Sequence, residues 1–95
     1  MRKRYSAELL RRLRNEIPIA WLIGDYLRWP ARRRNGQFVF VCPLCSESES
    51  DVKRETNLSR CFHCERNFNP IEFTMATQAM EFVEPVEFLK PLLRD

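Results

Sequence analysis

The chain has 95 residues, 44% of them hydrophobic, which favours one small globular domain over a disordered chain. Its net charge of +3 is uneven, because residues 1–34 hold ten Lys and Arg against three Asp and Glu, whereas the remainder holds six against ten. No apolar stretch approaches the roughly 20 residues of a membrane span and acidic residues interrupt the start, so we expect a cytoplasmic protein without a signal peptide.

A first helix is predicted to begin after Ser6, whose hydroxyl suits an N-cap. Leucines then recur at helical spacing, and arginines occupy the opposite face. The helix should end near Asn15, because Pro18 disfavours helical backbone at Ile17. The leucines of the apolar face are Leu9, Leu10 and Leu13.

A second helix is predicted to open at Pro18, whose missing N–H costs nothing at a first helical position. Gly24 weakens this helix modestly, and Trp21 lies off its apolar face. Pro30 ends the element. The face predicted to be buried consists of Ile19, Leu22, Ile23, Tyr26 and Leu27.

The basic helical segment, residues 1–34, ends in three consecutive arginines, Arg32, Arg33 and Arg34. Such a charge excess attracts a polyanion such as nucleic acid, although solubility alone would also account for it. Asn35-Gly36 is a turn signal. The following residues, 37–41, are predicted to form a strand in which Phe38 and Phe40 share one face.

The four cysteines, Cys42, Cys45, Cys61 and Cys64, form two pairs in the pattern C-x₂-C-x₁₅-C-x₂-C. This spacing is typical of a zinc site, because two tight turns can place four thiolates around one tetrahedral ion. Two disulfides, which a cytoplasmic chain would keep reduced, and a redox or iron–sulfur role are the alternatives. Four thiolates leave no position for water, so we expect one structural Zn²⁺. His63 is expected at the surface or beside the ligands rather than as a ligand.

Between the cysteine pairs, residues 46–51 are interpreted as an acidic, serine-rich loop and residues 53–60 as one short strand. Two or three strands that bracket the metal turns make a zinc ribbon, and with helices on both sides the fold class is small α+β. We therefore predict a single domain, residues 1–95, which divides into the basic segment 1–34, the ribbon 35–68 and closing helices 69–95.

The first closing helix should start at residues 69–72, where Asn69 can cap it and Glu72 can complete a capping box. Ile71, Met75 and Ala79 are predicted to lie on one face of this helix. A last helix should begin near Pro85 and be kinked or ended by Pro91. Its apolar residues are Val86, Leu89 and Leu93.

Three stretches carry a family resemblance: the helix over residues 19–27, the metal turns Cys42-Pro43 and Cys61-Phe62-His63-Cys64, and the closing helices from Phe73 through Phe82 to Leu89. In this order they resemble the zinc-binding domain of bacterial DnaG-type primases, the CHC2 zinc finger, over about residues 17–93. The resemblance implies a ribbon whose sheet meets the nucleic-acid template.

The sequence departs from this family at the metal turns. The family usually has histidine at the position of Cys45, so the tetrad here is more negative. Residues 46–51 replace a stretch rich in Lys, Thr, Pro and Phe, and residues 65–67 replace glycines expected after the last ligand.

We find no catalytic constellation. The carboxylates are scattered rather than clustered as a Mg²⁺ site requires, and Gly24 and Gly36 are isolated, so there is no phosphate-binding loop. Primases also need catalytic and helicase-binding domains that 95 residues cannot house. The resemblance therefore implies a stand-alone relative or a piece of a longer chain, and we expect a module that is not an enzyme.

The function predicted first is zinc-dependent binding of nucleic acid, specifically of single-stranded DNA, in replication or mobile-element DNA metabolism. Aromatic rings would stack on bases while cations follow the phosphates. Packing against the helices is the alternative for both Phe38 and Phe40. The alternative is a protein-interaction module that docks on a replication or recombination enzyme, with Trp29 as an exposed aromatic residue. For Trp29 itself, a lid over the core is the other interpretation. No membrane or small-molecule substrate is expected. The residues predicted to contact nucleic acid are Arg32, Arg33, Arg34, Phe38, Phe40, Lys53, Arg54 and Arg60.

Overall fold

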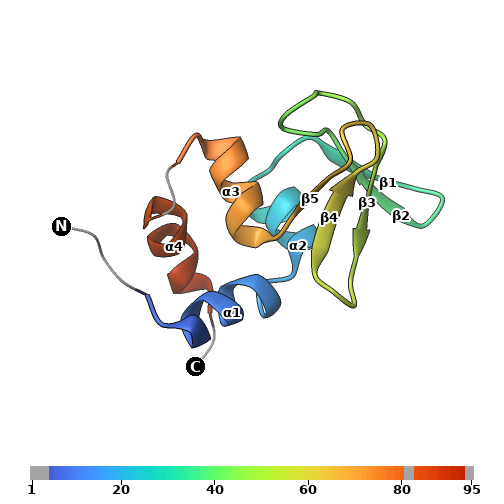
Figure 1. Cartoon of the computed structure of the whole chain (residues 1–95). Coiled ribbons are helices and arrows are strands. Elements are labelled where there is room, and N and C mark those ends of the chain that lie inside the picture. Colours follow the sequence, from blue (N-terminus) through green and yellow to red (C-terminus); the bar gives the residue numbers. More distant parts are fainter. Residues whose placement is uncertain (1–4, 81–82, 94–95) are drawn as a thin grey trace.

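The computed structural model describes residues 5–80 and 83–93, and it separates the chain into a helical half and a ribbon half (Figure 1). The expected small α+β fold with a zinc ribbon is confirmed. In chain order the elements are α1 (Ala7–Asn15), α2 (Ile19–Trp21), the π-helical turn η1 (Leu22–Tyr26), β1 (Ala31–Arg34), β2 (Gln37–Phe40), β3 (Ser50–Lys53), β4 (Leu58–Cys61), β5 (Arg66–Phe68), α3 (Pro70–Gln78), α4 (Val83–Leu89) and the 3₁₀ turn η2 (Lys90–Leu92).

Helix α1 has the predicted start and end. The Oγ of Ser6 accepts a hydrogen bond from the backbone N–H of Leu9 at 3.0 Å, and the helix ends at Asn15. Leu13 is fully buried on the side that faces α3 and α4. The amphipathic pattern of the first helix therefore directs its packing as expected.

The second helix differs from its prediction in one respect. It starts at Ile19 with Pro18 as N-cap, but it widens into a π-helical turn from Leu22 onward. A π turn holds more residues than an α turn, so Tyr26 rotates out of the predicted core face and is 41% exposed. The prediction that Tyr26 is buried was wrong, whereas Trp21 lies off the core as predicted.

Strands β1 and β2 form an antiparallel hairpin in which Arg34 pairs with Gln37. The turn residues Asn35 and Gly36 both have positive φ, +52° and +81°, as a two-residue type I′ turn requires. Residues 31–34 were expected to belong to the helical segment, but they form β1. The predicted division between residues 34 and 35 therefore falls inside a hairpin.

Strands β3, β4 and β5 form a second antiparallel sheet in that order. Residues 53–60 were expected to be one strand; instead they hold the end of β3, a turn and most of β4. The expected loop over residues 46–51 likewise ends inside β3. Asn57, at φ +53°, provides the left-handed backbone at which the turn reverses the chain.

Ser50 links the two sheets. Its buried hydroxyl accepts a hydrogen bond from the backbone N–H of Phe40 at 2.8 Å and donates one to the carbonyl oxygen of Phe40 at 2.6 Å. A single side chain thus satisfies both backbone groups of a β2 residue that lies beside β3. This explains why a serine in an acidic stretch belongs to a strand rather than to a loop.

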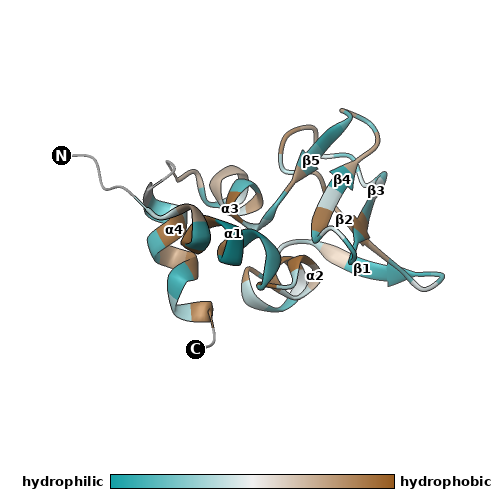
Figure 2. Ribbon diagram, turned by 60° about the horizontal axis from the view of Figure 1, so that its bottom comes forward, coloured by the Kyte–Doolittle hydropathy of each residue, from teal (hydrophilic) through white to brown (hydrophobic). Residues whose placement is uncertain are grey.

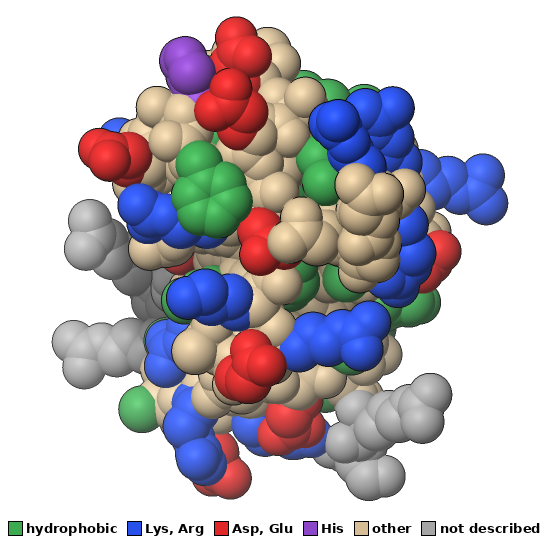
Figure 3. Space-filling model, turned by 90° about the vertical axis from the view of Figure 1, so that its right-hand side faces the viewer, with side chains coloured by type: hydrophobic (Ala, Val, Ile, Leu, Met, Phe, Trp, Pro, Cys, Tyr) green, Lys and Arg blue, Asp and Glu red, His purple; other side chains and the backbone are tan. Residues whose placement is uncertain are grey.

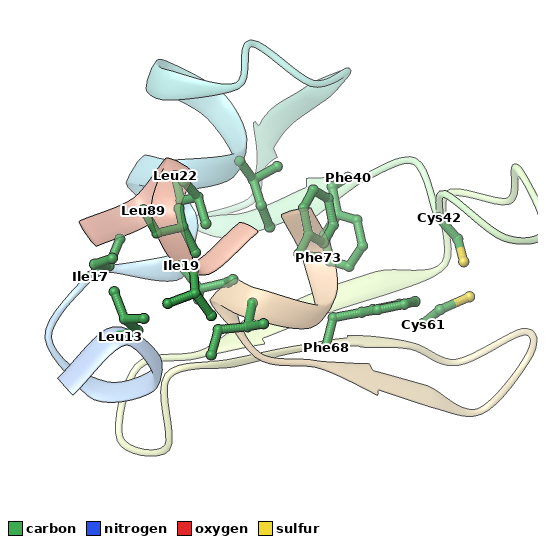
Figure 4. Close-up of a cluster of buried hydrophobic side chains, with 13 residues drawn as sticks. Leu13, Ile17, Ile19, Leu22, Phe40, Cys42, Cys61, Phe68, Phe73 and Leu89 are labelled. Carbon is green, nitrogen blue, oxygen red and sulfur yellow. The ribbon is translucent and has the colours of Figure 1, made fainter. Parts of the chain in front are cut away.

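The core is centred on Phe73 of α3 (Figure 4). Its ring centroid lies 5.5 Å from that of Phe40, 5.9 Å from that of Phe68 and 6.2 Å from that of Trp29, each in an edge-to-face arrangement. Cys42 and Cys61 belong to the same buried cluster, with their sulfurs at its ribbon end. In the ribbon diagram, α3 and α4 carry hydrophobic stretches, whereas β1 and β5 are largely hydrophilic (Figure 2).

The closing helices follow their start signals. Asn69 and Glu72 form the predicted capping box of α3, and Pro85 lies in α4, which gives way to η2 next to Pro91. Ile71 is buried and Met75 half-buried, whereas Ala79, predicted on the same face, is the exposed C-cap of α3 with φ +52°. Phe82, part of the stretch that carries the family resemblance, lies outside the described residues.

Asn57 also joins the ribbon to the helices. Its Oδ1 accepts a hydrogen bond from the N–H of Ile19 at 2.9 Å, and its Nδ2 donates to the carbonyl oxygens of Arg14 at 2.6 Å and Ile17 at 2.7 Å. Pro18 has no side chain that could cap the second helix, so Asn57 supplies the cap from 38 residues away.

Replacing Asn57 with alanine should lower the free energy of unfolding by about 2–4 kcal/mol, because a part-buried N–H and two carbonyl oxygens lose their partner. Urea unfolding of the zinc-loaded protein measures this. Asn57→Gly keeps the positive φ available and separates the hydrogen-bond loss from backbone strain. Equal stability of wild type and both variants would contradict the proposed cap.

Candidate metal centre and nucleic-acid interface

The two metal turns have matching backbone geometry. The first, residues 42–45, follows β2, and the second, residues 61–64, starts at the last residue of β4. The residue after each turn has positive φ, +64° at Ser46 and +56° at Glu65. Such backbone favours glycine, which the resemblance led us to expect after the last ligand. Glu65 therefore adopts the conformation of the missing glycine.

The four thiols converge on one point. Their sulfurs all lie within 4.8 Å of one another, with Cys42 and Cys64 at 3.6 Å and Cys45 and Cys61 at 3.5 Å. A tetrahedral Zn²⁺ with bonds of about 2.3 Å has sulfur–sulfur edges of about 3.8 Å, whereas a disulfide bond is about 2.05 Å. The cysteines are free thiols, and their arrangement fits a single zinc ion.

The backbone next to the cysteines also donates a hydrogen bond to one of the sulfur ligands. The N–H of Leu44 donates a hydrogen bond to the Sγ of Cys42 at 3.4 Å. Cys42 and Cys61 are buried, while Cys45 and Cys64 are half-buried. Since four thiolates complete the coordination of the ion, the site supplies structure rather than a bound, activated water. The exposed His63 is not one of the converging ligands, as predicted.

The thiols of Cys61 and Cys64 differ in pKa. Burial, together with the neighbouring thiols of Cys61 and Cys42, raises the pKa of the Cys64 thiol to about 12. Burial acts in the same direction on Cys61, but hydrogen bonds from the Cys64 backbone N–H and the Cys45 thiol outweigh it and lower its pKa to about 7. Zinc must therefore displace protons at neutral pH, and its affinity rises with pH.

Phe40 does not belong to the predicted nucleic-acid interface. It is 1% exposed and packs against Phe73, so its ring cannot stack on a base. It does share a strand face with Phe38, as predicted, but at the Phe40 end this face is covered by α3. Phe38 at the open end is half-buried.

A groove of about 670 Å³ brings several of the other predicted residues together. It lies between α2 with η1 on one side and β1, β2 and the β3–β4 turn on the other. It is lined by Arg32, Arg33, Arg54 and Phe38, and also by Trp21, for which no binding role was predicted from the sequence. We call it the Trp21 groove.

A second hollow of about 480 Å³ adjoins the Trp21 groove. The residues that they share include Arg33, Phe38 and Arg54, and the second adds Lys53 together with the acids Asp51 and Glu55. Lys and Arg side chains gather along one side of the ribbon end of the molecule (Figure 3). Arg34 is exposed on β1 but lines neither hollow.

The Phe38 ring lies close to Gly24 of η1. A Cβ at Gly24 would lie 3.4 Å from Cε2 and Cζ of the Phe38 ring. Both residues line the Trp21 groove. Because 3.4 Å is an ordinary van der Waals distance, an alanine at this position would also fit against the ring.

Arg60 lies outside the two hollows. Its guanidinium carbon is 5.9 Å from the ring centroid of Phe62, a cation–π distance, and its Nη1 donates a hydrogen bond to Oδ1 of Asn67 at 3.1 Å. Phe62 is 52% exposed and was not predicted to have a role. The sequence feature that could have pointed to Phe62 is its position between the metal ligands Cys61 and Cys64.

Trp29 is a half-buried lid rather than an exposed contact residue. Its Nε1 donates a hydrogen bond to the carbonyl oxygen of Val41 at 2.6 Å, and its ring meets Phe73 edge-on. Of the two interpretations of Trp29, an exposed contact residue and a lid over the core, the half-buried side chain supports the lid. In residues 5–80 and 83–93, no helix combines the length and the apolar character needed to cross a bilayer.

Comparison with known proteins agrees with the resemblance noted from the sequence. The family model described as CHC2 zinc finger matches residues 5–93. A DNA primase of Staphylococcus epidermidis is 26% identical over 88 residues, and one of Halalkalibacterium halodurans is 29% identical over 91. These matches cover 90% and 94% of this chain but 14% and 15% of the relatives, so the chain corresponds to a small part of their length.

Proposed function

Because the chain belongs to the CHC2 zinc finger family, we propose that it is a zinc-dependent module that binds nucleic acid, preferentially single-stranded DNA, in DNA replication or mobile-element DNA metabolism. The observation that carries this proposal is the Trp21 groove, where three guanidinium groups and two aromatic rings meet. Single-strand binding proteins combine these two elements, cations for phosphates and rings for bases.

The arginines of the groove support a polyanionic ligand. Among the residues that the structure describes, none of Arg32, Arg33 and Arg54 forms an ion pair with a carboxylate, and all three are exposed. Asp25 is the acidic residue that lines the groove. Uncompensated cations in a hollow concentrate a phosphate backbone there.

The proposed role is binding rather than catalysis, because the zinc ion is enclosed by thiolates. The proposed setting is the cytoplasm, which keeps such thiols reduced. The relatives named DNA primase are about seven times longer, so a longer replication or mobile-element protein is the proposed working partner. The proposal includes neither a membrane nor a small-molecule substrate.

A protein-interaction function is the second candidate, and the metal turns favour it. Leu44 and Phe62 are 55% and 52% exposed there, and three exposed acids, Glu47, Glu49 and Glu65, lie close to them in sequence. Apolar side chains among acids suit a basic protein surface, such as that of a replication or recombination enzyme.

Replacing Arg32, Arg33 and Arg54 together with alanine should weaken binding of single-stranded DNA about 100-fold at low salt and flatten its salt dependence, because about three phosphate contacts are lost. Fluorescence anisotropy at several salt concentrations measures both.

The matched control replaces Arg11, Arg14 and Arg66, which are exposed, lie outside both hollows and carry the same charge. An equal loss in this control would show that only net charge matters. Salt-independent binding of a protein partner without DNA binding would favour the second candidate.

A further inference from the structure

Trp21 occupies an unusual position for a large apolar side chain. It is 40% exposed at the end of α2, contributes nothing to the buried core and forms part of the wall of the Trp21 groove. Exposing so much indole surface is unfavourable in water. This cost suggests that the exposed indole surface has a ligand.

The indole is held in place by two further rings. Its centroid is 5.5 Å from that of Tyr26 with the planes tilted by 31°, and Tyr26 meets Phe88 of α4 edge-on, also at 5.5 Å. Trp21 and Tyr26 are five residues apart, the spacing that a π-helical turn brings onto one side. A ring fixed in this way loses little conformational entropy when it binds a second ring.

The remaining walls of the groove specify the chemistry of that ligand. Phe38 supplies a second aromatic edge, and Arg33 and Arg54 supply cations at the boundary with the adjoining hollow. The volume of about 670 Å³ is within the usual range for small-ligand sites. A purely apolar ligand would leave the guanidinium groups without partners, whereas a nucleotide offers both a flat base and a phosphate.

We propose that Trp21 is a base-stacking residue, and that the Trp21 groove receives one unpaired base against the indole while Arg33 and Arg54 bind the neighbouring phosphates. The inference rests on the proposed function and adds to it the position of the base. In a duplex both faces of each base are covered by its neighbours, so the subsite selects single strands.

The test compares two ligands with the same phosphates, a short oligothymidylate and an abasic oligonucleotide of equal length. Trp21→Ala should weaken binding of the oligothymidylate by about 5- to 150-fold, the value of one stacked base, and leave the abasic affinity unchanged. Trp21→Phe should restore most of the loss. Zinc content and melting temperature of Trp21→Ala should match the wild type, because the side chain lies outside the core.

Fluorescence provides an independent readout. In the Trp29→Phe variant Trp21 is the remaining tryptophan, and its emission should be quenched by the oligothymidylate but not by the abasic strand. Wild-type protein that binds both ligands equally, or a Trp21→Ala loss that is the same for both, would overturn the stacking subsite while leaving phosphate binding intact. Binding of neither ligand by the wild type would overturn the proposed function itself.

Discussion

Replacing Cys61 with serine should abolish zinc binding and unfold the ribbon. Cys61 is fully buried, ends β4 and pairs in register with Ser50 on one side and Arg66 on the other. Zinc binding in small domains is worth about 10–16 kcal/mol, which is comparable to the whole stability of a typical domain, about 5–15 kcal/mol. Elemental analysis of the purified variant measures the loss of zinc, and near-ultraviolet circular dichroism measures the loss of folded structure. A strong chelator should cause the same loss of structure in the wild type.

The matched control is Cys45→His. Histidine nitrogen binds Zn²⁺ at about 2.0–2.1 Å and removes one negative charge from the tetrad, so this variant should keep its zinc and its fold. The family resemblance, with histidine usual at this position, leads to the same expectation. A Cys61→Ser protein that remained folded with its zinc, or a metal-free wild type with an unchanged spectrum, would contradict the structural role of the ion.

Replacing Phe73 with alanine should lower the free energy of unfolding of the zinc-loaded protein by about 3–5 kcal/mol. The ring is fully buried and touches the rings of Phe40, Phe68 and Trp29, which come from three separate parts of the chain. Its loss leaves a cavity that rigid aromatic neighbours cannot collapse to fill.

Urea unfolding at fixed free zinc measures this cost, since ligand concentration itself changes apparent stability. The control is Phe88→Ala, which removes the same ring from a half-buried position and should cost clearly less. Equal costs at the two positions would show that Phe73 is not the centre of the core.

Local signals in the sequence were sufficient where one residue determines the backbone. The N-cap Ser6, the turn Asn35-Gly36 and the capping box of Asn69 and Glu72 are all present as predicted. The failures arose where tertiary contacts decide. Residues 53–60 form a turn and parts of two strands because the Asn57 side chain reaches back to the helices, and no local pattern encodes a bond across 38 residues.

The candidate site, too, could be predicted from the sequence only in part. Cysteine spacing alone predicted four converging thiols, because the geometry of zinc leaves few other arrangements. The aromatic part of the interface could not be predicted: strand alternation put Phe38 and Phe40 on one face, but only the packing of α3 shows that Phe40 is covered. The place of Trp21 in the groove could not be predicted, because the groove forms only when α2 packs beside strands that come later in the chain.

The position of Asn57 couples the metal to the groove. The β3–β4 hairpin that carries Asn57 runs on to Cys61, so one short segment both holds a zinc ligand and fixes the start of the second helix, which forms one wall of the groove. A chain that loses its ion would release that wall even though every arginine and aromatic residue of the groove remains. Zinc supply would then regulate how many copies of the protein can engage a ligand, with no need for a separate regulatory site.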